Sequence, residues 1–108
     1  MIGAMRAETL KGHLDFLLLA ILADEPTHGY RIIEELKRRS AGAFELPEGT
    51  VYPALHRLEE SGLLASSWAS GSGRRRRVYR LTPRGRRALA GARHEWRGFT
   101  KAVEAVVA

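Results

Sequence analysis

Side chains with the chemistry for catalysis or metal binding are scattered rather than grouped along this sequence. It contains no cysteine, which excludes disulfides, thiolate metal sites and cysteine nucleophiles. The separations between its four histidines, His13, His28, His56 and His94, match no pair of metal ligands on one helix face. No Ser/His/Asp grouping forms a recognisable motif. The sequence therefore predicts a protein that is not an enzyme and that uses no metal or cofactor.

A polar face on the stretch 48–64, EGTVYPALHRLEESGLL, favours a different chemistry. Its apolar stripe consists of Val51, Leu55, Leu58 and Leu63. The side chains off this stripe are Thr50, Tyr52, Pro53, His56 and Arg57. One α-helix fits the major groove of DNA, where arginine can bind guanine and hydroxyl groups can reach phosphates. We therefore predict that these five residues contact DNA, the alternative being that they are merely solvated outer residues.

Four consecutive arginines follow this stretch, namely Arg74, Arg75, Arg76 and Arg77. At the tip of a β-hairpin they would be suited to the minor groove or to flanking phosphates, with strand alternation placing some on each face. Such a run alone is weak evidence for DNA binding. It is stronger evidence here, because the run follows two helices that are predicted to form a helix-turn-helix. We therefore predict that all four arginines contact DNA.

The positive charge of the chain is concentrated in its second part. Residues 1–60 hold 7 basic and 10 acidic side chains, whereas residues 61–108 hold 11 basic and 2 acidic ones, which gives the net charge of +6. A basic segment attracts polyanions and releases counterions from phosphates, so nucleic acid or an anionic membrane surface is the expected partner. The alternative is an arginine-rich genome, because arginine outnumbers lysine by 15 to 3.

Hydrophobic spacing predicts three helices before the arginines, over about 9–23, over about 28–40 and over the stretch already described. Thr27 is the predicted N-cap of the second helix, and His28 is expected to bond locally at the start of that helix. The apolar face of the helix is predicted to be Tyr30, Ile33 and Leu36. Because proline lacks the backbone donor, the third helix is expected to start near 49–50 or to bend at Pro53. Gly62 suits a left-handed C-terminal cap.

Two short segments, 63–68 and 76–81, predict a hairpin around the flexible stretch ASGSGRR. Thr82 and Pro83 then suit the cap and the first position of a last helix that runs nearly to the C-terminus. The expected fold class is mainly α with a small β-hairpin. Glycines 85, 91 and 98 should each weaken the last helix by up to ~1 kcal/mol relative to alanine.

The last helix carries an apolar seam with the spacing of a coiled coil. Its members are Leu89, Ala92, Trp96, Phe99, Val103 and Val106. A stripe this long at the end of a small domain needs a partner surface, and we predict a homodimer. The alternative is that the helix folds back on the core of its own chain.

Three segments resemble the PadR family of bacterial transcriptional regulators: LKGHLDFLLLAILADEPTHGYRIIEEL, GTVYPALHRLEESGLL and GRRRRVYRLTPRG. The resemblance covers about residues 8–100, and HGY and YPALHRLE are its most specific parts. It implies a winged helix-turn-helix over 8–82 and a dimerisation helix over 83–108, as in the shorter subgroup of the family. By the same resemblance, Thr50, Tyr52 and the four arginines of the hairpin correspond to DNA contacts. It also implies a site for a flat aromatic or cationic ligand on Trp96, although a tryptophan in such a seam is more often plain packing.

Together these patterns predict a cytoplasmic, homodimeric winged-helix repressor that binds a pseudo-palindromic operator on double-stranded DNA and is released by a small ligand. The longest apolar run, FLLLAILA, is too short to span a bilayer, so we expect no membrane association. One rival is a DNA-binding regulator without a small-molecule sensor. The other is a winged-helix protein-interaction module that does not touch DNA.

Overall fold

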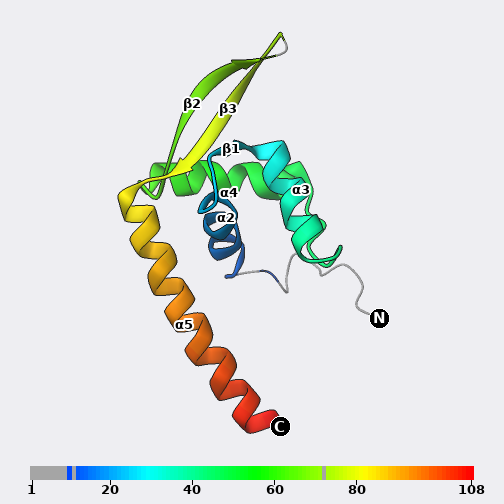
Figure 1. Ribbon diagram of the computed structural model, residues 1–108, viewed down its shortest axis with the longest axis vertical. Helices are drawn as coiled ribbons and strands as arrows, with labels where there is room; N and C mark the ends of the chain where they lie inside the picture. The colour runs from blue at the N-terminus through cyan, green and yellow to red at the C-terminus, as the bar shows by residue number, and fades with distance from the viewer. Residues whose placement is uncertain (1–9, 11, 72) are drawn as a thin grey trace.

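The structure is a computed structural model that describes residues 10, 12–71 and 73–108, in which four helices accompany one small antiparallel sheet (Figure 1). In chain order the elements are α2 (Leu14–Leu22), β1 (Thr27–His28), α3 (Gly29–Arg39), α4 (Glu48–Glu60), β2 (Leu64–Gly71), β3 (Arg74–Leu81) and α5 (Pro83–Val107). The strand order in the sheet is β1-β3-β2. The predicted fold class is therefore confirmed, and the sheet has one strand more than expected.

The first helix starts later than its hydrophobic spacing predicts. The spacing predicts 9–23, whereas α2 spans Leu14–Leu22. Gly12 has a φ of +88°, a left-handed conformation that an α-helix interior does not contain. Leu10 is nevertheless buried in the core, which explains why it fits the spacing. Residues 8, 9 and 11 of the predicted helix and domain lie outside the described residues.

The second helix has a different N-cap from the predicted Thr27. The Nδ1 atom of His28 accepts a hydrogen bond of 3.2 Å from the backbone amide of Arg31. Thr27 instead lies in β1 and pairs with Tyr79 of β3. A strand of two residues is too short to give a periodic pattern in the sequence. The pairing places the start of α3 at the edge of β3.

The third predicted helix is α4, and it contains Pro53 in its interior. Its N-cap is Pro47, whose carbonyl oxygen accepts hydrogen bonds from the amides of Thr50 and Val51 at 3.0 and 3.2 Å. Pro53 therefore lies beyond the first turn, where its missing donor removes one backbone hydrogen bond. Gly62 ends the helix with a φ of +78°, as predicted, and the amide of Leu63 reaches the carbonyl of Leu58 at 3.0 Å.

The hairpin of β2 and β3, which we call the wing, is longer than predicted. Predicted strand limits were 63–68 and 76–81, but pairing extends to Gly71 opposite Arg74. The four arginines are therefore strand residues and not part of the turn. Because each one lies in an extended strand, the face of the wing on which it lies follows from strand alternation.

The core lies between α2, α3, α4 and the base of the sheet. Its members include Leu18, Leu22, Ile32, Leu36, Val51, Leu55, Leu58, Leu64, Tyr79 and Leu81. The predicted apolar face of α3 is partly wrong, because Tyr30 is 55% exposed and Ile32 is fully buried in its place. The buried face of α3 is therefore rotated around the helix axis relative to the predicted face.

The last helix leaves this core after its first turns (Figure 1). The hydroxyl of Thr82 accepts a hydrogen bond of 3.0 Å from the amide of Gly85, and Pro83 is the first helical residue, both as predicted. Within α5 only Gly85 and Leu89 are buried. Among the described residues, no helix has the length and apolar character needed to cross a membrane.

Candidate nucleic-acid interface

The exposed surface of α4 has an outer face and two flanks. With 100° between successive residues, Gly49, Pro53, His56 and Glu60 lie opposite the buried stripe. All four are exposed. The two flanks differ in what they contact, and the predicted residues Tyr52 and Arg57 lie on different flanks.

Tyr52 lies on the flank that meets the wing. Its ring packs on Gly29 so closely that a Cβ at Gly29 would be 2.6 Å from the ring carbons. Burial raises the pKa of the Tyr52 hydroxyl, and the carboxylate of Glu48 raises it further, so the hydroxyl stays protonated at neutral pH and can donate a hydrogen bond. Tyr52 is therefore held in one place at the start of α3.

A hollow of about 400 Å³, which we call the notch, opens beside Tyr52. It is lined by His28, Gly29, Tyr30, Glu48, Tyr52, Arg74, Arg75, Arg76 and Arg77. The predicted contacts Tyr52 and the four arginines thus border one surface. Guanidinium groups beside such a hollow are suited to binding phosphate oxygens.

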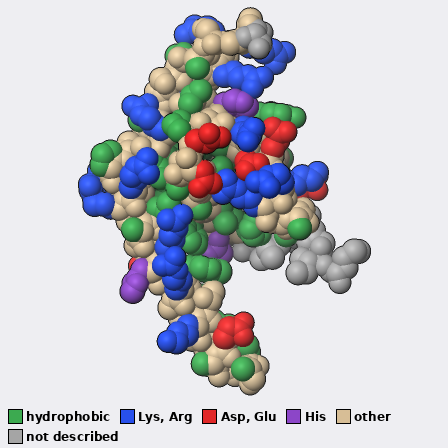
Figure 2. All heavy atoms as spheres, viewed as in Figure 1, with side chains coloured by type: hydrophobic (Ala, Val, Ile, Leu, Met, Phe, Trp, Pro, Cys, Tyr) green, Lys and Arg blue, Asp and Glu red, His purple; other side chains and the backbone are tan. Residues whose placement is uncertain are grey.

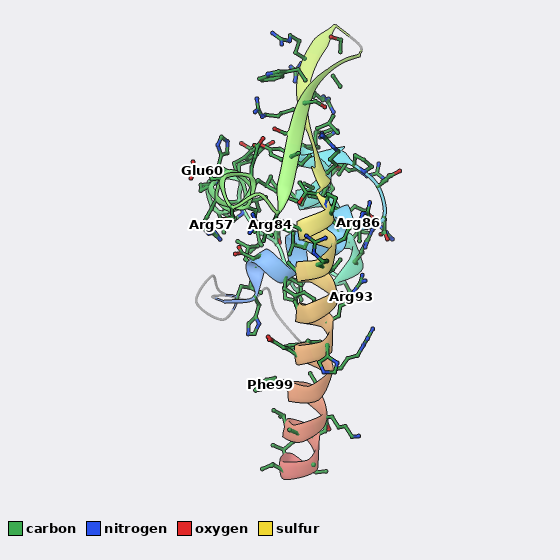
Figure 3. The ribbon with its side chains drawn as sticks, turned by 90° about the vertical axis from the view of Figure 1, so that its left-hand side faces the viewer. Arg57, Glu60, Arg84, Arg86, Arg93 and Phe99 are labelled. Carbon is green, nitrogen blue, oxygen red and sulfur yellow. The ribbon has the colours of Figure 1, made fainter. Side chains whose placement is uncertain are left out.

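Arg57 lies on the other flank of α4, which faces α2. Its Nη2 atom is 2.5 Å from the Oδ1 atom of Asp15, and both side chains remain about half exposed. Figure 3 shows Arg57 on the side of α4 away from the wing, and Glu60 on its outer side. The predicted reading face is thus split: Pro53 and His56 face outward, while Arg57 is paired with α2.

Strand alternation divides the four arginines between the two faces of the wing, as expected. Arg75 and Arg77 share a face with Trp68, and their guanidinium carbons lie 4.8 and 5.2 Å from the centre of its ring. Arg74 and Arg76 belong to the opposite face, where Nη1 of Arg76 is 2.7 Å from Nε2 of His28. The positive charge on one face of the wing therefore lies beside a tryptophan ring, and that on the other face lies beside a histidine.

One polar link fixes the wing against α4. The hydroxyl of Ser66 donates a hydrogen bond of 2.6 Å to Glu59, and Nε of Arg77 donates one of 2.8 Å to Ser66. Nη2 of Arg77 is also 3.7 Å from the carboxylate of Glu59. The face of the wing with Trp68 therefore continues directly from the flank of α4 that carries Tyr52 and Glu59.

Positive charge is also visible beyond the notch. Figure 2 shows lysine and arginine side chains gathered on the wing and in a row along α5. Arg86 and Arg93 belong to this row (Figure 3). Within the described part of the chain, no three histidine or acidic side chains gather into a metal site.

The fold and this arrangement match a known family. The model of the Transcriptional regulator PadR-like family matches residues 18–91, which include the end of α2, all of α3 and α4, and the whole wing. The chain belongs to the PadR-like family. It is therefore a transcriptional regulator and not an enzyme.

Individual transcriptional regulators are similar to this chain in sequence or in fold. The transcriptional regulator Rv3488 from Mycobacterium tuberculosis is 49% identical over 67 residues, which cover 62% of this chain and 60% of that protein. A solved transcriptional regulator from Clostridium thermocellum superposes with a TM-score of 0.86 at 26% identity, covering 97% of this chain and all of the other. A PadR family transcription regulator from Clostridium difficile gives a TM-score of 0.78 at 34% identity, covering 89% of this chain and 99% of its own.

The predicted seam of α5 is largely uncovered in the single PadR-like chain. Leu89 is buried and Ala92 is half-buried, whereas Trp96 is 42% and Phe99 60% exposed. Val103 and Val106 are exposed as well. Phe99 projects from α5 on the side away from Arg86 and Arg93 (Figure 3).

A second hollow of about 420 Å³ lies at Trp96, the predicted ligand residue. The ring centre of Trp96 is 5.6 Å from that of His13, 6.3 Å from that of Phe16 and 6.1 Å from that of Phe99. The carboxylate-bearing Glu95 also lines the hollow. The surroundings of Trp96 are thus aromatic with one acidic side chain.

Sequence reasoning missed two residues of this interface. Trp68 was not singled out, although it alternates with serines in the segment SSWAS opposite the arginines. Glu59 was also missed, because its contact with the wing depends on how the hairpin packs. The local bond predicted for His28 at the start of the second helix is confirmed.

Proposed function

We propose that this PadR-like regulator acts in the cytoplasm as a homodimeric repressor on a pseudo-palindromic operator. In each subunit α4 enters a major groove with Thr50, Tyr52, Pro53 and His56 near the bases and phosphates. The arginines of the wing hold the neighbouring backbone and minor groove. The observation that carries the proposal is the notch, because Tyr52 of α4 and the arginine segment of the wing border it together.

Arg57 has a more restricted part in this proposal. Because one of its nitrogens is paired with Asp15, the guanidinium either exchanges Asp15 for DNA or uses the N–H groups that Asp15 leaves free. Contact with DNA through the free N–H groups keeps the α2 to α4 link intact. Arg57 therefore belongs at the edge of the reading surface that faces α2.

A salt titration tests the proposal. Affinity for duplex DNA should fall steeply as salt rises, with a slope of about -0.9 for each phosphate that the protein neutralises. Replacing Arg75 and Arg76 together with alanine should flatten this slope, measured by fluorescence anisotropy of a labelled duplex. The matched control replaces Arg86 and Arg93 of α5, which removes the same charge outside the wing. An affinity that does not depend on salt would instead favour the protein-interaction module.

Release by a small ligand is the second part of the proposal. A flat aromatic or cationic compound stacked on Trp96, beside Glu95 and the aromatic rings around it, would change the spacing of the two α4 helices across the dimer. Titration with planar cations should alter tryptophan fluorescence and release the bound duplex together. If neither changes, the rival without a small-molecule sensor is correct.

A further inference from the structure

Trp68 is a large apolar side chain placed far from the hydrophobic core. It lies in the middle of β2, pairs with Arg77 across the hairpin and is 55% exposed. It takes no part in the core cluster. Its ring contacts instead two guanidinium groups, those of Arg75 and Arg77, at 4.8 and 5.2 Å. A tryptophan face attracts such cations more strongly than the face of any other aromatic side chain does.

The two arginines on Trp68 differ in what else holds them. Arg77 is bound to Ser66 and lies near the carboxylate of Glu59, which partly neutralises it. Arg75 is in no salt bridge with the described residues, and its guanidinium contacts the ring of Trp68. A contact with an aromatic face leaves the N–H groups of a guanidinium that do not point at the ring free to donate. Trp68 therefore orders Arg75 without using its hydrogen bonds.

The position of this pair along the wing agrees with the spacing of grooves in DNA. Strands advance about 3.3 Å per residue, which places Trp68 about 13 Å beyond Leu64 and Ser70, the partner of Arg75, about 20 Å beyond it. Leu64 is the first residue of β2, directly after α4. A minor groove lies half a duplex turn, about 17 Å, from the centre of the neighbouring major groove. With α4 in the major groove, the wing is thus long enough for Arg75 to reach the next minor groove.

We infer that Trp68 is a positioning residue that holds Arg75 in the minor groove beside the half-site and thereby gives the regulator a preference for A·T pairs there. This inference rests on the proposed function and adds a source of sequence selectivity outside α4. A·T-rich minor grooves are narrow and attract arginine, whereas G·C pairs place the N2 amino group of guanine in the way. Arg74 and Arg76, on the other face, contribute charge without this selectivity.

Base analogues test the inference directly. Inosine lacks the N2 amino group, so an I·C pair resembles G·C in the major groove and A·T in the minor groove. We would select a bound 30-base-pair duplex from random sequences and replace the pairs that flank its half-sites by A·T, I·C or G·C. The parent protein should bind the A·T and I·C duplexes alike and the G·C duplex more weakly. Weaker binding of both I·C and G·C would overturn minor-groove reading.

Variants of the wing assign the effect to named residues. Trp68→Ala should weaken binding to the A·T duplex by about threefold to tenfold, as expected for loss of a cation–π contact. It should also remove most of the preference over G·C. Trp68→Tyr keeps an aromatic face and should retain most of that preference. Circular dichroism and thermal unfolding of each variant check that the fold is kept.

Arg74 and Arg75 are a matched pair, because they are neighbours of equal charge on opposite faces of the wing. Arg75→Ala should abolish the preference for A·T over G·C, whereas Arg74→Ala should lower affinity for all three duplexes by the same factor. Equal behaviour of the two variants, or unchanged binding by Trp68→Ala, would overturn the inference. If the parent protein bound no duplex in a salt-dependent way, the proposed function itself would fail instead.

Discussion

His28 is the residue at which the start of α3 and the wing meet. Nδ1 accepts from the amide of Arg31, and Nε2 lies against Arg76. Burial lowers the pKa of His28 below its usual 6.5; Arg76 and Arg31 lower it further, and Glu34 opposes them. As the pH falls through 6.5, the unfolded chain therefore binds the proton before the folded chain does. Acidification should thus lower the free energy of unfolding.

We predict that the His28→Asn variant loses this part of the pH dependence. Asparagine caps a helix N-terminus well and does not titrate. The melting temperature of the parent should fall between about pH 7.5 and about pH 5.5, around the usual pKa of histidine, and that of the variant should fall less. His94→Asn, at an exposed position of α5, is the control. A variant that follows the pH profile of the parent would contradict the prediction.

At the scale of single residues, the sequence predicts contacts between residues that are close in the chain better than contacts between distant ones. The local bond of His28 to its own helix follows from its place before an amphipathic segment. Its contact with Arg76, 48 residues away, does not, because it depends on the pairing of β1 with β3. Arg57 illustrates the same limit: its polarity is visible in the sequence, but its pairing with Asp15 is not.

Among the elements, α5 shows most clearly what glycine does in a helix. The sequence alone treats Gly85 and Gly91 alike, as residues that weaken it. In the structure a Cβ at Gly85 would be 2.1 Å from the carbonyl oxygen of Leu63, whereas a Cβ at Gly91 would meet nothing within 4 Å. Gly85 is therefore required for the close approach of α5 to the start of β2.

We predict opposite effects of alanine at these two positions. Gly91→Ala should stabilise the protein by up to ~1 kcal/mol, the propensity difference in an open helix position. Gly85→Ala should destabilise it by more than ~1 kcal/mol, because backbone must move to admit the methyl group. Urea unfolding of both variants at one protein concentration measures the two values. Effects of equal sign would show that the packing of Gly85 does not govern the outcome.

The sequence predicts the order of the elements better than their ends. Hydrophobic spacing finds α3 and α4 because each buries an apolar stripe, and it finds α5 because its apolar seam repeats over several turns. It extends the first helix back through Gly12, whose positive φ does not fit an α-helix, and α2 begins only at Leu14. It also shortens the wing, since the outer halves of β2 and β3 bury no side chain that could give a periodic signal.

At the scale of the whole molecule, α5 projects from the core and leaves much of its seam uncovered (Figure 1). The chain measures 53 Å along its longest axis and only 21 Å along its shortest. Trp96, Phe99 and Val103 repeat at heptad spacing along the exposed part of the seam. The basic row of α5 lies on another side of the helix, so a second copy can cover the seam without bringing the two rows together.

Phe99→Glu tests this proposed dimer. Burying an unpaired carboxylate in the seam costs several kcal/mol, so the dissociation constant of the dimer should rise by more than about 100-fold. Ala90→Glu makes the same change of charge at an exposed position outside the seam and is the matched control. Sedimentation equilibrium should show a monomer for Phe99→Glu and a dimer for Ala90→Glu and the parent. Because two linked reading helices bind a two-part operator together, the monomer should also lose operator affinity. A Phe99→Glu protein with the parent's mass in solution would place the subunit contact elsewhere.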